Sequence, residues 1–230
     1  MSENTAALPD WDRVLSSACR LQQLLPGAVL VGGTAAAIHA EHRLSQDADH
    51  VVPDLRRRFD EILAQLESAA GWQTARVTRP VQILGSLDGI ETGVSQLIRS
   101  EPLETTTLQH RDATLTIPTP AEILRIKGVL ILKRNATRDY IDFATLAHHM
   151  GDQATAEALR SFDRLYHQDN GESALQQLQA QLASPLPYDL EGTELSEYKN
   201  LAAQWHDWNA VTVACAHVAV IVFDYVCEQK

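Results

Sequence analysis

The chain has 230 residues, of which 45% are hydrophobic, so it is long enough for one large domain or two smaller ones with an ordinary packed core. Its formal net charge of −11 argues against broad, nonspecific nucleic-acid binding, because such binding depends on Lys and Arg neutralising phosphates. Three cysteines without a CxxC pair argue against a disulfide framework or a zinc ribbon. Together with the lack of a signal-peptide pattern in Met1–Asp10, they predict a cytoplasmic protein.

The charge is unevenly distributed along the chain. Residues 151–230 hold 12 acids and 4 bases, whereas residues 121–139 hold 5 bases and 2 acids. We therefore expect a local basic patch in an acidic protein, with a C-terminal part that is a poor place for RNA. The long apolar run 210–226 is interrupted by polar residues, so it predicts a buried helix rather than a membrane span.

The first half of the chain alternates predicted helices and strands. In chain order, we expect a helix over 11–25, a strand over 28–31, a helix over 34–41 capped by Thr34, a strand over 47–52 and a helix over 53–67. Further strands are predicted over 76–84 and 90–98 around a hairpin turn at 86–89, with one or two more over 105–117. This pattern favours an α/β (α+β) architecture with a mixed sheet.

The second half is predicted to be helical. Thr119-Pro120-Ala121-Glu122 combines a capping box with proline at the first helical position, which indicates a helix start. A second helix, capped by Thr137, is expected through Met150, and the remainder is expected to be helical apart from a loop at 184–193. The chain therefore divides into an α/β domain over 1–117 and a helical domain over 118–230.

One segment points to chemistry. Gly32-Gly33 is followed by thirteen residues, Thr34 to Gln46, and then by Asp47-Ala48-Asp49. Two glycines allow a backbone to approach a triphosphate closely, and the N-terminus of the following helix favours anions. Two aspartates one residue apart on a strand point to the same side and can share divalent metal ions. The segment predicts a site for phosphate and metal.

This arrangement resembles the signature of the nucleotidyltransferase superfamily. Within it, several stretches are similar to the AbiEii/AbiGii toxin family over roughly residues 28–150: Gly32-Gly33-Thr34-Ala35, His42-Arg43-Leu44-Ser45, Lys127, Arg134 and Arg138-Asp139-Tyr140-Ile141-Asp142. The resemblance implies a nucleotidyltransferase-like mixed sheet over 1–117, with the helical domain completing the cleft. It also implies transfer of a nucleoside monophosphate from an NTP to a hydroxyl, with a tRNA 3′ end as acceptor and a cognate antitoxin as partner.

The same resemblance assigns roles to residues. Metal ions, Mg²⁺ or Mn²⁺, would bind Asp47 and Asp49, and catalysis would depend on Asp47, Asp49, Lys127 and Asp142. Nucleotide contacts would come from Gly32, Gly33, Thr34, Arg43, Ser45, Lys127, Arg134 and Arg138. The chain departs from the pattern in two ways, because His50 stands where an apolar residue is expected and no third acid is evident. Glu91 is the candidate for that third metal ligand.

Alternative interpretations remain open at the level of sequence. The acceptor could be a protein or a small cationic molecule, which the acidic charge of the chain favours a little. The chain could also be a noncatalytic nucleotide-binding module, consistent with His50 and the unfilled third acid. Single residues have plain alternatives too: Arg43 and Ser45 could shape the turn before the aspartates, and the basic residues could form a solvated face.

Overall fold

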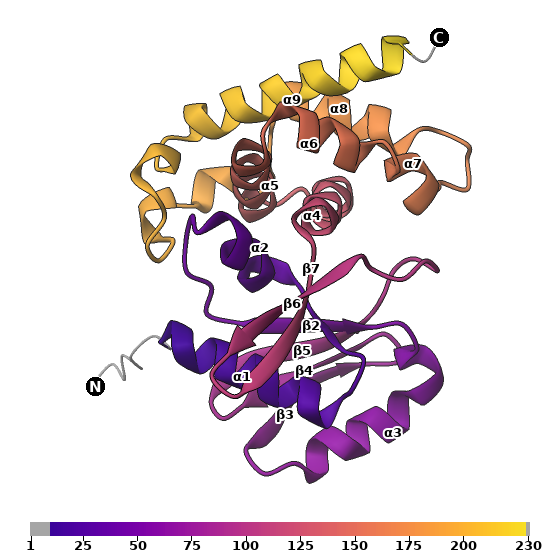
Figure 1. The fold of residues 1–230 in the computed structure, drawn as a ribbon, viewed down its shortest axis with the longest axis vertical. Coiled ribbons are helices and arrows are strands. Elements are labelled where there is room, and N and C mark those ends of the chain that lie inside the picture. Colours follow the sequence, from indigo (N-terminus) through magenta and orange to yellow (C-terminus); the bar gives the residue numbers. More distant parts are fainter. Residues whose placement is uncertain (1–9, 229–230) are drawn as a thin grey trace. The chain divides into compact units, whose positions relative to one another are not determined.

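The computed structural model describes residues 10–228, which form two compact units that we describe separately (Figure 1). The α/β unit comprises Met1–Thr34, Ser45–Ser100 and Thr105–Ile117. The helical unit comprises Ala35–Leu44, Glu101–Glu104 and Pro118–Lys230. The helix α2 (Gly32–Ala40) begins in the first unit and ends in the second.

The α/β unit is built on a five-stranded mixed sheet. Its elements are α1 (Trp11–Leu24), β1 (Val29–Leu30), β2 (Ala48–Val52), α3 (Leu55–Ser68), β3 (Trp72–Thr78), β4 (Gln82–Leu87), β5 (Ile90–Gln96), β6 (Thr105–His110) and β7 (Ala113–Pro118). The strand order is β1-β2-β5-β4-β3, with β2 parallel to β5 and the other neighbours antiparallel, while β6 and β7 form a separate ladder. The predicted mixed α/β architecture is confirmed.

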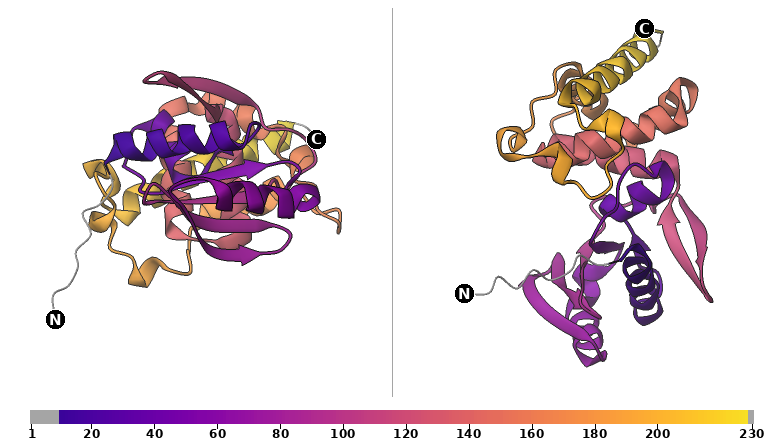
Figure 2. Two further views of the ribbon diagram at one scale, coloured as in Figure 1. Left: turned by 90° about the horizontal axis from the view of Figure 1, so that it is seen from below. Right: turned by 90° about the vertical axis from the view of Figure 1, so that its left-hand side faces the viewer.

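One face of this sheet is buried beneath α1 and α3, which lie alongside it in Figure 2. Because strand side chains alternate, Ile83 and Val94 enter this core while their neighbours point to the other face. The helix α3 contributes a stripe at helical spacing, Leu55, Phe59, Ile62 and Leu66, and each such side chain stabilises the fold by about 1.5–3 kcal/mol on burial. The opposite face is more polar and carries Asp49.

The helical unit packs its helices around a second core. They are α4 (Pro120–Arg134), α5 (Thr137–Met150), α6 (Asp152–Leu159), α7 (Phe162–Leu165), α8 (Ala174–Ala183) and α9 (Trp208–Glu228), with the short 3₁₀ helices η1 (Leu190–Gly192), η2 (Leu195–Glu197) and η3 (Ala203–Trp205). The predicted start of α4 is confirmed, since Thr119 Oγ1 accepts from Glu122 N–H at 3.2 Å. For α5, however, Asp189 caps the helix, accepting from both the N–H and the Oγ1 of Thr137 at 2.7 Å.

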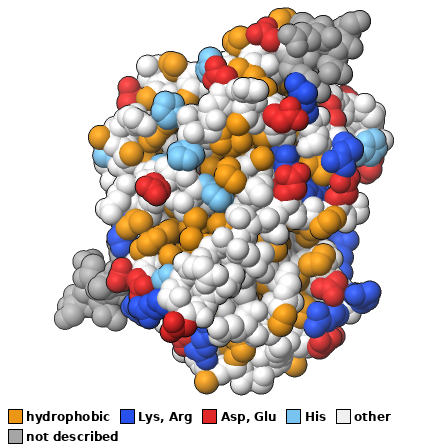
Figure 3. Space-filling view, viewed as in Figure 1, with side chains coloured by type: hydrophobic (Ala, Val, Ile, Leu, Met, Phe, Trp, Pro, Cys, Tyr) orange, Lys and Arg blue, Asp and Glu red, His pale blue; other side chains and the backbone are white. Residues whose placement is uncertain are grey.

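The helix α9 is buried along one side only. Val211, Cys215 and Val222 face the core, whereas Val213 and Phe223 are more than half exposed, so the prediction of a buried helix is half right. The helix also lines an apolar hollow of about 470 Å³ within the helical unit. In the space-filling view of Figure 3, hydrophobic side chains, in orange, are exposed on the face of the molecule that is drawn. Between residues 10 and 228, no helix has the length and hydropathy that crossing a bilayer requires.

The prediction of one strand over 76–84 is wrong. The chain turns at residues 79–81, so that β3 and β4 form an antiparallel hairpin with a register shift between Thr74 and Arg76. Pro80 explains the turn, because proline has no N–H to donate to a continuous ladder. The second hairpin is as predicted, with Leu87 opposite Ile90 across the turn at Asp88-Gly89.

The packing of β3 on β4 depends on Gly85. A Cβ at this position would lie 2.5 Å from the carbonyl oxygen of Gln73 and 2.7 Å from the Trp72 ring. We predict that Gly85→Ala lowers the free energy of unfolding by about 1–3 kcal/mol, the usual cost of overpacking, as measured by urea unfolding. Gly192→Ala is the matched control, because nothing lies within 4 Å of a Cβ there. Equal stability of the two variants would contradict this account.

Candidate active site

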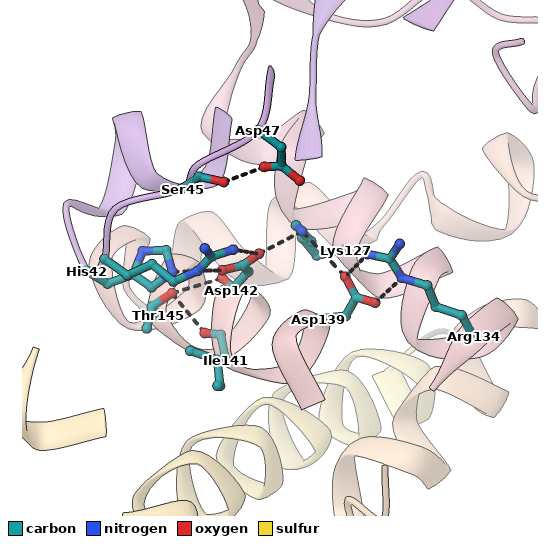
Figure 4. A network of polar contacts seen from close by, with 10 residues as sticks. His42, Ser45, Asp47, Lys127, Arg134, Asp139, Ile141, Asp142 and Thr145 are labelled. Carbon is teal, nitrogen blue, oxygen red and sulfur yellow. Dashed lines mark hydrogen bonds and ion pairs between the residues drawn. The ribbon is translucent and has the colours of Figure 1, made fainter. Parts of the chain in front are cut away.

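Asp47 is held by the loop that leads into β2. Ser45 Oγ donates to Asp47 Oδ1 at 2.6 Å, and Thr34 Oγ1 donates to the main-chain oxygen of Asp47 (Figure 4). Thr34 therefore does not cap α2, which begins two residues earlier than predicted, so that both glycines lie in its first turn. Ser45 is buried and shapes the turn, one of the two roles open to it from the sequence.

Asp49 lies between two glycines. Its partner in the β2–β5 register is Gly93, where a Cβ would lie 3.1 Å from Asp49 Oδ1 and 2.7 Å from Leu84 Cδ2. On its other side, a Cβ at Gly32, the first residue of α2, would lie 3.6 Å from Asp49 Cβ, an ordinary contact, but Gly32 has a φ of +73°, which favours glycine. A side chain at Gly93 would therefore crowd the carboxylate of Asp49, and the backbone at Gly32 disfavours a side chain there. Gly93 was missed, although a glycine inside a strand marks such close approaches.

Glu91 shares a sheet face with Asp49 but does not complete a metal centre. It lies two residues before Gly93 on β5 and is exposed. Among residues 10–228, no group of three or more His, Cys, Asp or Glu side chains could hold a metal ion. Asp47 and Asp49 still fit Mg²⁺ chemically, because this ion is commonly bound by one or two carboxylates together with substrate phosphates.

His50 behaves as a core residue. It is 1% exposed on the buried face of the sheet, where its Nδ1 contacts the carbonyl oxygen of Ala48 at 2.8 Å. Burial lowers the pKa of His50 to about 4, although this hydrogen bond opposes the shift. The side chain is therefore neutral near pH 7 and fills a position where an apolar residue was expected.

The helical unit contains a second group of predicted residues, which we call the Asp142 cluster: His42, Arg43, Lys127, Arg134, Asp139 and Asp142. Asp142, on α5, is fully buried and binds three partners (Figure 4). His42 Nε2 and Arg43 Nε contact its Oδ1 at 2.8 Å, Arg43 Nη2 contacts its Oδ2 at 3.0 Å, and Lys127 Nζ lies 2.7 Å from the same oxygen. Both carboxylate oxygens therefore face donors.

These partners decide the charge state of Asp142. Burial alone would raise the pKa of its carboxyl, but the charges of Arg43 and Lys127, with hydrogen bonds from His42 and Arg43, hold that pKa well below its usual range. A general base must take up a proton during the reaction. Asp142 is unsuited to that role and suited to anchoring cations instead.

Lys127 and Arg134 share the neighbouring acid, Asp139. Lys127 is 1% exposed and its Nζ lies 3.4 Å from Asp139 Oδ1, while Arg134 binds Asp139 through both Nε and Nη2. Arg138 is exposed, on α5. The structure thus groups Lys127, Arg134, Arg43 and Asp142, and separately Gly32, Thr34, Ser45 and the two aspartates. Asp139 and His42 lie within stretches that resemble the family pattern, and the structure shows each of them bound to a predicted site residue.

The family model for the nucleotidyl transferase AbiEii toxin of type IV toxin–antitoxin systems matches residues 13–212. The chain belongs to this family. The resemblance of its sequence motifs to these toxins is thus confirmed at the level of the family.

Two solved structures have a fold similar to that of this chain. A Helicobacter pylori protein described as a nucleotidyltransferase has a TM-score of 0.54 at 14% identity and covers 100% of this chain and 99% of its own. JHP933 of the same organism has a TM-score of 0.52 at 15% identity, covering 95% and 92%.

Among curated proteins, the heme uptake protein MmpL11 of Mycobacterium tuberculosis is 31% identical over 245 residues. The match covers 95% of this chain and 24% of that protein. The lipid exporter MmpL11 of Mycolicibacterium smegmatis is 36% identical over 137 residues, covering 58% of this chain and 14% of the exporter. This AbiEii chain therefore spans about a quarter or less of the length of these relatives.

Removing Asp142 should be costly. In Asp142→Ala, Arg43 stays buried without this carboxylate and Lys127 keeps the longer contact with Asp139, and we predict a loss of about 3–5 kcal/mol in the free energy of unfolding. Because its pKa is depressed in the folded state, Asp142 contributes fully above about pH 4 and progressively less as the pH falls below that value. Urea unfolding from pH 7 to pH 3 should show wild type and variant converging.

Asp169→Ala, which removes an exposed loop carboxylate, is the control for this experiment. It should track wild type at every pH. A constant difference between wild type and Asp142→Ala down to pH 3 would contradict the assigned charge state.

Proposed function

We propose that this chain transfers a nucleoside monophosphate from an NTP to a hydroxyl at a tRNA 3′ end, as the toxin of a toxin–antitoxin pair. The observation that carries the proposal is the placement of Asp49 between Gly32 and Gly93, with Asp47 fixed beside it by Ser45 and Thr34. NTPs and tRNA are both made in the cytoplasm, where we place the reaction. A cognate antitoxin follows from the description of the family.

In the proposed reaction, the residues of the α/β unit have distinct roles. Asp47 and Asp49 hold Mg²⁺ or Mn²⁺, which when bound offsets the charge that builds on the leaving pyrophosphate. The amides of Gly32 and Gly33 and the positive end of the α2 dipole receive phosphate oxygens. Glu91, exposed on the same sheet face, serves at most as an outer partner rather than a direct metal ligand.

The Asp142 cluster supports this site rather than performing chemistry. Asp142 fixes Arg43 and Lys127 in place, and Asp139 fixes Lys127 and Arg134. We assign Lys127 a positioning role, because its ammonium is buried against two carboxylates. Contacts with the NTP or with the RNA backbone fall to the partly exposed Arg134 and the exposed Arg138, whose planar guanidinium groups suit phosphate.

The transfer reaction can be tested directly. Purified protein is incubated with each α-labelled NTP, Mg²⁺ and either tRNA or total RNA, beside Asp47→Asn and Asp49→Asn. We expect label on tRNA with wild type and a loss of at least about 100-fold with either variant, because each removes a charged metal ligand. Asp169→Asn, an exposed loop carboxylate, should retain activity.

The outcomes separate the acceptor from the chemistry. Label on protein or on a small molecule, with RNA untouched, would overturn the tRNA acceptor and keep the transferase. Equal labelling by wild type and both variants would contradict the assigned metal ligands. NTP binding by calorimetry without any pyrophosphate release would instead select a noncatalytic nucleotide-binding module.

Gly93 offers a second test of the same site. Gly93→Ala places a methyl group against Asp49 Oδ1 and Leu84 Cδ2, and we predict a fall in kcat on the order of tenfold to hundredfold from the displaced carboxylate. The double variant Gly93→Ala, Leu84→Ala relieves the contact with leucine alone. If Asp49 is the cause, the double variant regains stability in urea but not kcat. Recovery of both would contradict the role given to Gly93.

A further inference from the structure

We propose that the segment Leu195–Ala202 is a clamp that positions the loop 41–45, and through this loop Asp47, with Tyr198 as a positioning residue. The inference deepens the proposed function and rests on it for its catalytic part. Neither the aspartates nor the glycines of the family pattern lie in this segment, which carries no motif of its own.

The first support is main-chain pairing between segments distant in sequence. Leu44 N–H donates to the carbonyl oxygen of Lys199 at 2.8 Å, and Ala202 N–H donates to the carbonyl oxygen of His42 at 2.8 Å. The loop therefore binds the clamp on both sides of Arg43. Each bond of this kind stabilises the pairing and restricts the backbone that carries it.

The second support is the environment of Arg43. Asp142 binds its guanidinium through two hydrogen bonds, and the ring of Tyr198 lies 5.7 Å from its Cζ (Figure 4 shows the Asp142 side). Arg43 is 9% exposed, so the ring contacts a largely desolvated cation. Under these conditions a cation–π contact is stronger than at an exposed site. Tyr198 thereby completes the surroundings that hold the middle of the loop.

The third support is that the clamp is itself anchored in the helical unit. Leu195 and Leu201, on either side of Tyr198, are buried in its core. Upstream, Asp189 binds the first residue of α5, and Tyr188 N–H donates to the carbonyl oxygen of Asn135 at 3.0 Å. The segment can therefore fix the loop, because it is itself attached at several points.

The consequence follows from chain length. Two residues separate Leu44 from Asp47, so any displacement of the loop reaches the carboxylate with little slack. Ser45, which binds Asp47 Oδ1, lies next to Leu44. Releasing the clamp should leave the reacting groups present but poorly placed, a fault that lowers kcat and raises the Mg²⁺ requirement more than it alters NTP binding.

The experiment compares Tyr198→Ala and Tyr198→Phe with Tyr188→Ala, a matched tyrosine control upstream of the clamp whose side chain is 75% exposed. Residue-resolved hydrogen exchange of the free protein should show the Leu44 amide exchanging about tenfold faster in Tyr198→Ala and unchanged in the other two. In transfer assays, Tyr198→Ala should lower kcat about tenfold and raise the half-saturating Mg²⁺ concentration several-fold, with KM for NTP within about twofold. Tyr198→Phe keeps the aromatic ring, so its kcat and its half-saturating Mg²⁺ concentration should equal those of wild type.

Unchanged exchange of Leu44 in Tyr198→Ala would overturn the clamp, and faster exchange with unchanged kcat would overturn its positioning role. A Tyr198→Phe variant as impaired as Tyr198→Ala would overturn the ring as the active element. If Tyr198→Ala does not fold, Tyr198→Leu keeps the apolar bulk without the aromatic face. If wild type transfers no nucleotide, the proposed function fails, while the exchange measurement still decides the clamp.

Discussion

The buried carboxylate of Asp142 is the interaction on which the helical unit depends. It is fully buried and brings together three cations or donors from α4 and from the loop after α2. A lone buried charge is expensive, so such a group persists only where partners surround it. Asp142 offsets part of the cost of burying Arg43 and Lys127, which makes the loop geometry dependent on α5.

That dependence links two stretches of sequence that are about a hundred residues apart. His42 and Arg43 lie just before the aspartates of β2, whereas Asp142 lies in the helical half of the chain. Asp142, one of the residues in the second half that resemble the AbiEii pattern, thus binds the loop after α2 within the helical unit. In the function we propose, one set of residues contacts the substrate, and a second set, which includes Asp142, holds other residues in position.

Local signals predicted the elements that depend on local physics. The capping box at Thr119 and the stripe of α3 were predicted correctly, because each depends on spacing along a single element. Of the two aspartates predicted on one strand, Asp49 lies in β2, whereas Asp47 lies in the loop just before it. Pro80 could have predicted the turn, because proline lacks the N–H that a continuous strand needs. The sequence analysis gave Pro80 no weight and therefore predicted one strand where there are two.

Other features were not legible, because they depend on segments that meet only in the folded chain. Gly93 matters since Asp49 lies across it, and Tyr198 matters since Arg43 lies beneath its ring. The contacts of Asp142 with His42, Arg43 and Lys127 likewise join segments that are distant in the sequence. Sequence patterns therefore reveal the residues of a motif more readily than the residues that hold the motif in position.

The central claim is that Asp47 and Asp49 hold the metal ion while Asp142 remains an anchor. A crystal structure with Mg²⁺ and a nonhydrolysable NTP tests it most directly. The account predicts Mg²⁺ ligated by both aspartates and by phosphate oxygens, with Asp142 still bound to Arg43 and Lys127. A metal ion ligated by Asp142, or bound away from Asp47 and Asp49, would contradict it.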